Sequence, residues 1–140
     1  KFMANAFYTN GYGELARSAT AWDAADHRTI LIDTSAYTFS AAHTSLTDVP
    51  AGSRLATLGA ALANKTVAND GSLDADDFVW PSVPSGDTGS AYIIYRHTGA
   101  DATAVPIAYI DTGYTGLPVT TDGNNITCAL PSGGALKIGA

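Results

Sequence analysis

Two aspartates with similar surroundings are the residues whose types and spacing could do chemistry. Asp33 lies in "LIDTSAYT" and Asp111 lies in "YIDTGYTG", which contains the Asp-Thr-Gly tripeptide typical of aspartic proteases. Such a protease needs two carboxylates about 3 Å apart that share a proton. Only residues 112–140 follow the second motif, which leaves no room for a comparable second lobe. The sequence therefore favours two strand ends, each with an Asp that accepts backbone hydrogen bonds within its own turn.

The acidic segment "NDGSLDADD" (residues 69–77) has the composition of a calcium loop. It lacks the D-x-D-x-D-G spacing and the distal Glu of such loops. A solvated turn is therefore the favoured interpretation, and the alternative is one cation held with water. The acidic residues in question are Asp70, Asp74, Asp76 and Asp77.

The histidines and the cysteine offer no recognisable site. His27, His43 and His97 are far apart in the sequence and show no metal-ligand spacing. Cys128 lies inside an apolar strand pattern, which predicts a small buried hydrophobe rather than a nucleophile. We therefore predict no catalytic, metal-binding or cofactor-binding residues, and a protein that is not an enzyme.

Composition restricts the class of protein further. The chain has 140 residues, 46% hydrophobic and only 14% charged, which is enough for one domain with a core. The net charge of −6 at pH 7 opposes binding to nucleic acid. No apolar run approaches the length of a membrane span, and a single cysteine fits synthesis in a reducing cytosol.

The domain organisation predicted from these patterns is an N-terminal arm (residues 1–9) and one domain (residues 10–140). The arm is apolar and aromatic without a helical or strand period. It could pack on its own core or dock on a neighbouring subunit, and both alternatives stay open. The residues predicted to bind a partner are Phe2, Met3, Phe7 and Tyr8.

Residues 9–20 are the one helix that the sequence predicts. Thr9 or Asn10 is expected to cap it, and Arg17 near its end would complement the helix dipole. Trp22 is expected to anchor the end of this helix to the core.

The remainder has a β pattern of short apolar runs separated by turn residues every 8–12 positions. Asp70-Gly71 and Asp122-Gly123 are strong hairpin signals. The pattern predicts an all-β, single-domain antiparallel β-sandwich (jelly-roll or Ig-like) with one short N-terminal helix. The predicted strands are 27–34, 53–62, 65–70, 76–83, 90–98, 104–112, 117–121, 125–131 and 134–140. For residues 53–62 the alanine content leaves a helix as the alternative.

The order of motifs resembles a group of small virion proteins of tailed bacteriophages, and the resemblance spans nearly the whole chain. The motifs are "MANAFYTNG" from Met3, Trp22-Asp23, "TILIDTSAYT", "LTDVPAGSRLAT", "KTV" followed by "DGSLDADDFVW", "SAYIIYRHTG", "PIAYIDT" and "GLPVTTDGNNIT". The chain departs from the pattern at its end. Many relatives have a Trp-containing strand and a Lys-Ile-Phe-like terminus there, whereas this chain reads "CALPSGGALKIGA".

The resemblance implies a non-enzymatic structural component of a virion, made in the host cytoplasm. Its expected partners are other virion proteins (the major capsid protein or tail proteins) and further copies of itself, without nucleic acid or membrane. An acidic chain suits the outer surface, so we expect a capsid decoration or cement protein that bridges neighbouring subunits. The alternative is a tail or fibre component that recognises a host surface glycan through exposed Trp80, Tyr92 or Tyr95.

Overall fold

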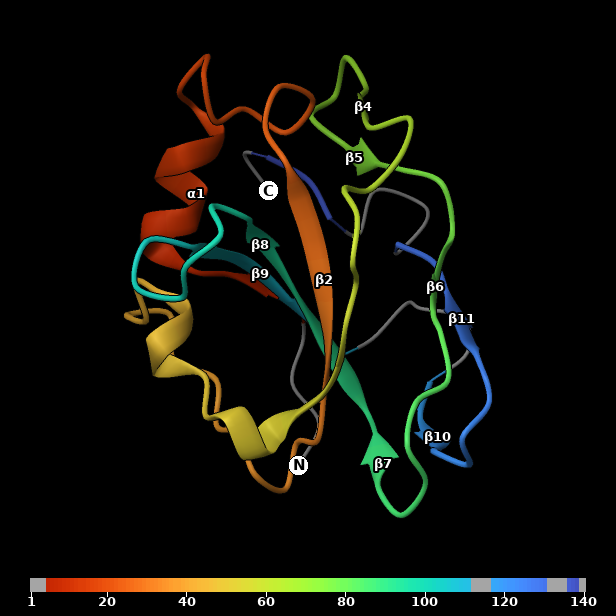
Figure 1. Ribbon diagram of the computed structural model, residues 1–140. Coiled ribbons are helices and arrows are strands. Elements are labelled where there is room, and N and C mark those ends of the chain that lie inside the picture. The colour runs from red at the N-terminus through yellow and green to blue at the C-terminus, as the bar shows by residue number, and fades with distance from the viewer. Residues whose placement is uncertain (1–4, 112–116, 131–135, 139–140) are drawn as a thin grey trace.

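A five-stranded antiparallel sheet forms the centre of the molecule, in the order β1-β9-β8-β2-β3 (Figure 1). The computed structural model describes residues 5–111, 117–130 and 136–138. The strands of this sheet are β1 (Ala6–Phe7), β2 (His27–Ile32), β3 (Arg54–Thr57), β8 (Ala91–Arg96) and β9 (Val105–Ile110).

Three smaller antiparallel pairs and three short helices complete the described structure. The pairs are β4 (Thr66–Val67) with β5 (Leu73–Asp74), β6 (Phe78–Trp80) with β11 (Ile126–Cys128), and β7 (Thr88–Gly89) with β10 (Val119–Thr120). The helices are α1 (Thr9–Leu15) and the 3₁₀ turns η1 (Leu46–Asp48) and η2 (Ala51–Ser53).

The three inner strands are buried on both faces. Leu31, Tyr92 and Ile110 are paired in one row across β2, β8 and β9, and all three belong to one core cluster. The next row contains Ile30, Ile93 and Tyr109, and it belongs to a second cluster on the other face. Side chains alternate between the faces of a strand, so unbroken apolar runs here require a cover on each side.

The first cover is the ribbon made by residues 78–89 and 119–128, at the right of Figure 1. Trp80, Phe78 and Cys128 point from it into the first cluster. The ring of Phe78 meets the rings of Trp80 and Tyr92 edge to face, with centroids 5.1 and 5.4 Å apart. Such contacts add to the burial of large apolar area.

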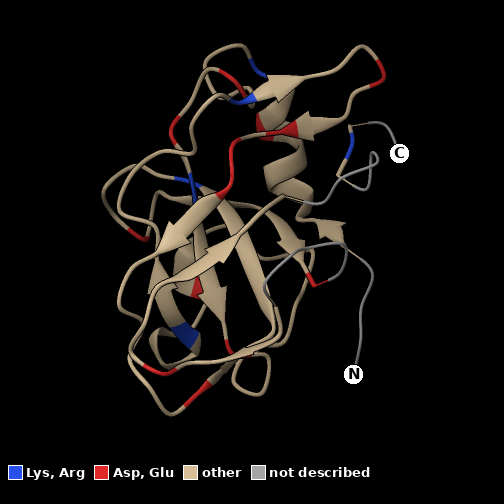
Figure 2. Cartoon of the chain, turned by 90° about the vertical axis from the view of Figure 1, so that its right-hand side faces the viewer, with Lys and Arg blue, Asp and Glu red and all other residues tan. Residues whose placement is uncertain are grey.

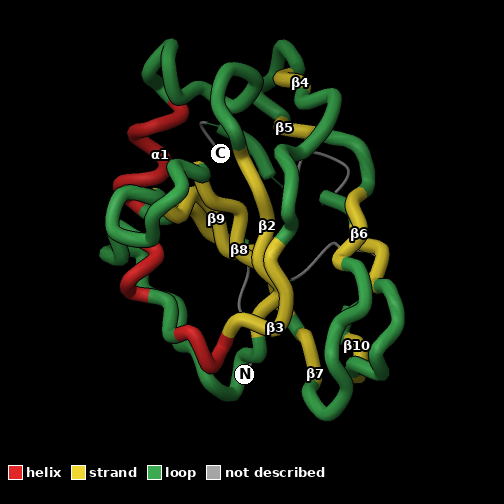
Figure 3. Tube along the Cα trace, viewed as in Figure 1, coloured by secondary structure: helices red, strands yellow, loops and turns green. Residues whose placement is uncertain are grey.

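The second cover is residues 33–53 together with Tyr8. It consists mostly of loops with two short helical turns, as Figure 3 shows. Tyr37, Leu46 and Val49 from this segment are buried against the second face of the sheet. The chain therefore encloses the sheet between two layers, which confirms the predicted all-β, single-domain, sandwich-like antiparallel fold with one short N-terminal helix.

The helix is shorter than predicted and begins differently. It ends at Leu15 rather than near residue 20, and Tyr8 occupies its N-cap without a side-chain cap bond. The expected cap at Thr9 or Asn10 is therefore wrong, because burial of Tyr8 sets where the helix begins. The expected role of Trp22 is confirmed: it is 1% exposed, shares a cluster with Leu15, and its Nε1 donates to the carbonyl oxygen of Asp74 at 3.0 Å.

The first hairpin signal, Asp70-Gly71, does mark a tight turn. The strand that follows the turn is not the predicted 76–83 strand. Gly71 has a φ of 89°, and Asp70 Oδ1 accepts the backbone N–H of Ser72 at 3.0 Å. The turn joins β4 to β5, whereas the predicted 76–83 strand forms β6 and pairs with β11. Only three residues of the predicted 134–140 strand are described, and Lys137 forms an isolated bridge with Ser72.

The second hairpin signal marks a bend instead of a hairpin. The strands on either side of Asp122-Gly123 pair with different strands, β7 and β6. At the bend, the N–H of Gly123 donates to the carbonyl oxygen of Val83. The N–H of Val83 donates to the carbonyl oxygen of Asn124. Two segments therefore continue side by side as a kinked ribbon, because a turn residue determines local backbone geometry and not the distant strand it pairs with.

Gly11 lies where α1 packs closely on the backbone of β9. A Cβ at this position would lie 2.2 Å from the carbonyl oxygen of Pro106 and 2.5 Å from the Cα of Ile107. Gly11→Ala is therefore expected to destabilise the fold by about 1–3 kcal/mol, because backbone atoms cannot move aside cheaply. The measurement is the free energy of unfolding in urea.

Gly13 in the same helix is the matched control. Nothing lies within 4 Å of a Cβ built on it, so Gly13→Ala should raise the free energy of unfolding by about 0.5–1 kcal/mol through helix propensity. Equal effects of the two substitutions would show that close packing on β9 is not what Gly11 provides.

Candidate functional site

The N-terminal segment predicted to be an arm is, over its described residues, an edge strand of the central sheet. Ala6 and Phe7 pair with Tyr109 and Ala108 of β9. The N–H of Tyr8 donates to the carbonyl oxygen of Ile107 at 3.0 Å. Residues 5–9 therefore belong to the domain, and the predicted boundary after residue 9 is not seen. Phe2 and Met3 lie outside the described residues.

Tyr8 cannot contact a neighbour as predicted, because it is 0% exposed within its own chain. Its hydroxyl lies 2.7 Å from that of Tyr37, which lies 2.8 Å from His43 Nδ1. Burial raises the pKa of Tyr8 far above its usual range, so the phenol stays neutral. The alternative in which this part of the segment packs on its own core is the one observed at Tyr8.

Phe7 and Tyr12 form the accessible aromatic pair near the N-terminal segment. Their ring centroids are 4.9 Å apart, Phe7 is half-buried, and Tyr12 is 37% exposed. Sequence reasoning missed Tyr12, because only the pairing of β1 with β9 and the start of α1 bring the two rings together.

The hydrogen-bonded chain of Tyr8, Tyr37 and His43 predicts an asymmetry between two substitutions. Tyr37→Phe leaves the buried hydroxyl of Tyr8 without this partner and should cost about 1–3 kcal/mol in free energy of unfolding. Tyr8→Phe should cost less, because the remaining Tyr37 hydroxyl keeps His43. Urea denaturation of both variants measures this, and an equal or reversed order would contradict the chain of bonds.

The two aspartates of the echoed motif lie at the same end of the sheet but are held apart. Asp33 follows β2 and Asp111 follows β9, and β8 lies between these strands. Two strand spacings of about 4.8 Å separate the strand ends by roughly 9–10 Å. The carboxylates therefore cannot share a proton in the way a protease dyad requires.

Asp33 has the predicted structural role. Its Oδ1 accepts the backbone N–H of Ser35 at 2.9 Å and the Ser35 hydroxyl at 2.7 Å. Asp111 is 6% exposed and its backbone N–H donates to Asn5 Oδ1 at 2.8 Å. The turn after Asp111 lies outside the described residues, so the predicted bonds within that turn stay a prediction.

Three of the four acidic residues of the 69–77 segment are directed to separate partners. Asp70 bonds Ser72 and lies 3.6 Å from Lys137 Nζ, Asp74 accepts the N–H of Ala75, and Asp76 accepts Asn64 Nδ2 at 2.6 Å. Within residues 5–111, 117–130 and 136–138, no group of three His, Cys, Asp or Glu side chains is arranged to hold a metal ion.

His27 is a buried neutral imidazole beside a lysine. It is 0% exposed, its ring centroid lies 5.1 Å from that of Trp22, and Lys65 Nζ lies 3.3 Å from its Nδ1. Lys65 also donates to the carbonyl oxygen of Ala25. Burial, reinforced by the charge of Lys65, lowers the pKa of His27 to about 4.

This shift makes stability depend on pH in a defined window. The pKa of His27 is about 4 in the folded protein and ordinarily 6.5, so the unfolded chain binds a proton that the fold excludes. The free energy of unfolding should therefore fall as pH decreases from 6.5 to 4, by about 3 kcal/mol in total. Urea denaturation across that window measures the slope.

His27→Asn removes the titrating group and keeps an acceptor near Lys65. It should flatten the slope between pH 4 and 6.5. Asp26 contributes mainly below this window, because hydrogen bonding to Arg28 places the pKa of that carboxyl below its ordinary 3.8. A variant with the wild-type slope would assign the pH dependence to other groups.

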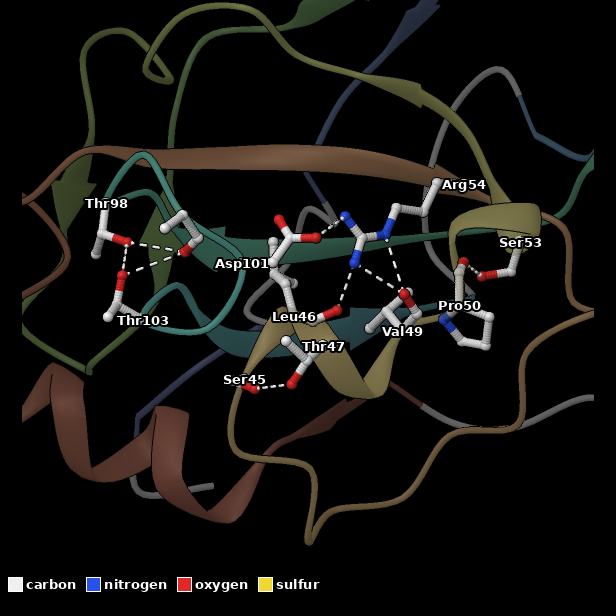
Figure 4. Close-up of polar contacts among 11 residues, drawn as sticks. Ser45, Leu46, Thr47, Val49, Pro50, Ser53, Arg54, Thr98, Asp101 and Thr103 are labelled. Carbon is white, nitrogen blue, oxygen red and sulfur yellow. Dashed lines mark hydrogen bonds and ion pairs between the residues drawn. The ribbon is translucent and has the colours of Figure 1, made fainter.

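Arg54 braces the second cover, as Figure 4 shows. Its guanidinium donates to the carbonyl oxygen of Val49 from Nε at 3.1 Å and from Nη2 at 2.8 Å, and also to that of Leu46. Its Nη1 forms an ion pair of 2.9 Å with Asp101 in the turn after β8. No sequence motif marks this site, because its parts are far apart along the chain.

Cys128 and the aromatic residues considered for glycan stacking are internal. Cys128 is 1% exposed, as predicted, and burial raises its thiol pKa to about 11, so at neutral pH it is a protonated, poor nucleophile. Trp80 and Tyr92 are 0% exposed and Tyr95 is 3% exposed. The expectation that these three rings are exposed is wrong, because they fill the two clusters on either side of the sheet.

Charged residues are spread over both ends of the molecule. Among the described residues, Figure 2 shows acidic positions on several loops and basic positions that are separate from one another. In the part of the chain that is described, no helix has both the length and the apolar character to cross a membrane.

Comparison with known proteins adds no family to this picture. No family model matches the chain, and no curated protein matches it.

Proposed function

We propose that this chain is a non-enzymatic structural component of a bacteriophage virion, an outer-surface decoration or cement protein that bridges neighbouring capsid subunits. The resemblance of its ordered motifs to small virion proteins supports this role. The observation that carries the proposal is the anchored N-terminal segment. Tyr8 and the β1–β9 pairing fix this segment to the domain from Ala6 onward, and Phe2 and Met3 precede it in the sequence.

Charge supports a place on the outside of the particle. A net charge of −6 opposes contact with packaged DNA. The uncharged character of the remaining surface favours packing against other proteins, since only 14% of the residues are charged. Repetition over many identical sites lets each bridge bury a modest area.

The residues that suggested chemistry support a structural role as well. Asp33 is used in a turn, and Asp70 and Asp76 bond within or beside their own loops. Polar side chains used in this way stabilise irregular backbone and are not gathered around a common point.

The alternative of a tail or fibre component that stacks a host glycan on Trp80, Tyr92 or Tyr95 is less favoured. All three side chains are buried, and a sugar ring needs an accessible aromatic face for stacking.

Deletion of residues 1–4 tests the proposed bridge. This deletion leaves β1 and Tyr8 in place, whereas removal of residues 1–8 would also remove part of the core. The variant should keep the wild-type melting temperature and bind capsids of the encoding phage at least about tenfold more weakly. Co-sedimentation with capsids that lack the protein measures binding.

A double substitution shows whether the deletion weakens binding through the loss of apolar side chains or through the shorter chain. Phe2→Ser combined with Met3→Ser should reproduce the loss, and Ala4→Ser, which changes only a small side chain, should bind as the wild type does. Full binding by the folded deletion variant would contradict the bridge formed by the N-terminal segment. Failure of the wild-type protein to bind capsids at all would contradict the decoration role.

A further inference from the structure

The hairpin formed by β4 and β5 has little buried side-chain area. Residues 63–70 are exposed apart from Lys65, which is half-buried. On either side of this stretch, Leu62 and Leu73 are buried in the first cluster. A segment that buries so little can detach at a lower free-energy cost than the sheet can unfold. Residues 62–74 are called the flap below.

Lys65 is the polar side chain that joins the flap to the start of β2, beside which β4 and β5 lie in Figure 1. Its Nζ donates to the carbonyl oxygen of Ala25 and lies 3.3 Å from Nδ1 of His27. It also lies 5.9 Å from the centroid of the Trp22 ring. The indole Nε1 of Trp22 donates to the carbonyl oxygen of Asp74 at 3.0 Å. The flap is therefore held through the immediate surroundings of one imidazole.

The contact with Lys65 requires that His27 is neutral. An ammonium group has donors only, so Nδ1 of His27 accepts and the ring proton is on Nε2. This Nε2 is buried and has no hydrogen-bond partner among the described residues. Protonation turns Nδ1 into a donor and places a positive charge 3.3 Å from the Lys65 ammonium, in a position that is 0% exposed. Both the lost hydrogen bond and the buried charge then oppose attachment of the flap.

The other charged groups around His27 do not compensate for this charge. Arg96 lies opposite His27 on β8 and adds a further cation, whose Nε is 3.2 Å from Oε2 of Glu14. The neighbouring carboxylate of Asp26 accepts from Arg28 with both of its oxygens, at 3.0 and 2.9 Å. An imidazolium here would therefore face cations on two strands and a carboxylate that is already engaged.

We propose that the flap is released by acid: protonation of His27 expels the Lys65 ammonium, and residues 62–74 detach while the sheet stays folded. Release would expose Trp22, which is 1% exposed in the attached state. Protonation of a buried histidine that shifts a two-state element is a known kind of switch. The inference does not depend on the capsid role, because it uses no residue of the N-terminal segment.

The pH window follows from the two states of His27. Burial, reinforced by the charge of Lys65, lowers its pKa to about 4 when the flap is attached, and the ordinary value is 6.5. The released state therefore binds a proton that the attached state excludes. Release becomes easier as the pH falls from 6.5 to 4.

Amide hydrogen exchange of the ¹⁵N-labelled full chain, followed by NMR near pH 7 and near pH 4.5, tests this release. The reporters are the N–H of Leu62, bonded to the carbonyl oxygen of His27 at 2.8 Å, and that of Leu73, bonded to that of Leu136 at 3.0 Å. After correction for intrinsic exchange, their protection factors should fall about 50-fold between the two pH values.

Two amides outside the flap serve as the internal comparison. The N–H of Asp33 donates to Ser53 and that of Leu46 donates to Ala104, both to carbonyl oxygens. Their protection factors should fall at least about fivefold less than those of the flap reporters, because the sheet and the second cover stay folded.

Three variants assign the effect to its residues. His27→Asn should remove most of the fall at the flap reporters. His97→Asn, which changes a half-buried histidine at the end of β8, is the matched control and should keep the wild-type fall. Lys65→Met keeps an unbranched side chain without the charge, so the fall should be at least about threefold smaller.

The proposal is overturned if protection at Leu62 and Leu73 falls no more than at Asp33 and Leu46, since acid would then act on the whole fold. It is also overturned if His27→Asn or Lys65→Met keeps the wild-type fall. Lys65→Met decides the question by itself if His27→Asn does not fold, because the lysine is only half-buried.

Discussion

The burial of β2, β8 and β9 on both faces is the constraint on which the rest of the structure depends. Antiparallel sheets commonly leave one face to solvent, but here rows such as Leu31-Tyr92-Ile110 and Ile30-Ile93-Tyr109 are apolar on both sides. The described part of the chain has no further sheet of equal size for either face. It therefore covers one face with a kinked ribbon and the other with irregular chain.

Irregular covers explain how the polar residues are used. Backbone groups outside regular structure need other partners when they are buried. Arg54 supplies donors to two carbonyls of the second cover, Trp22 supplies one to Asp74, and Asp33 accepts from its own turn. Asp33 and Asp111 of the echoed motif lie at the same end of the sheet, because β2 and β9 run in the same direction.

The parts of the fold that could be predicted from sequence are those with local causes. The runs at 27–34, 90–98 and 104–112 gave β2, β8 and β9, and the turn at Asp33 needed only its neighbours in sequence. The pairing of β6 with β11 could not be predicted, since turn residues carry no information on distant partners. The same holds for the candidate sites: Tyr8 meets Tyr37, and Arg54 meets Asp101, only after the sheet has formed.

The two covers differ in how much of their chain can change without loss of core packing. The first cover closes over large rings such as Trp80 and leaves little that can change without loss of core packing. The second cover consists of loops braced by single side chains, and loops on a fixed scaffold are where binding residues are commonly carried. Tyr8 holds the N-terminal segment to the domain and shares one cluster with Tyr37, Leu46 and Val49 of this cover. The attachment of that segment therefore depends on the packing of this irregular layer, and not only on the pairing of β1 with β9.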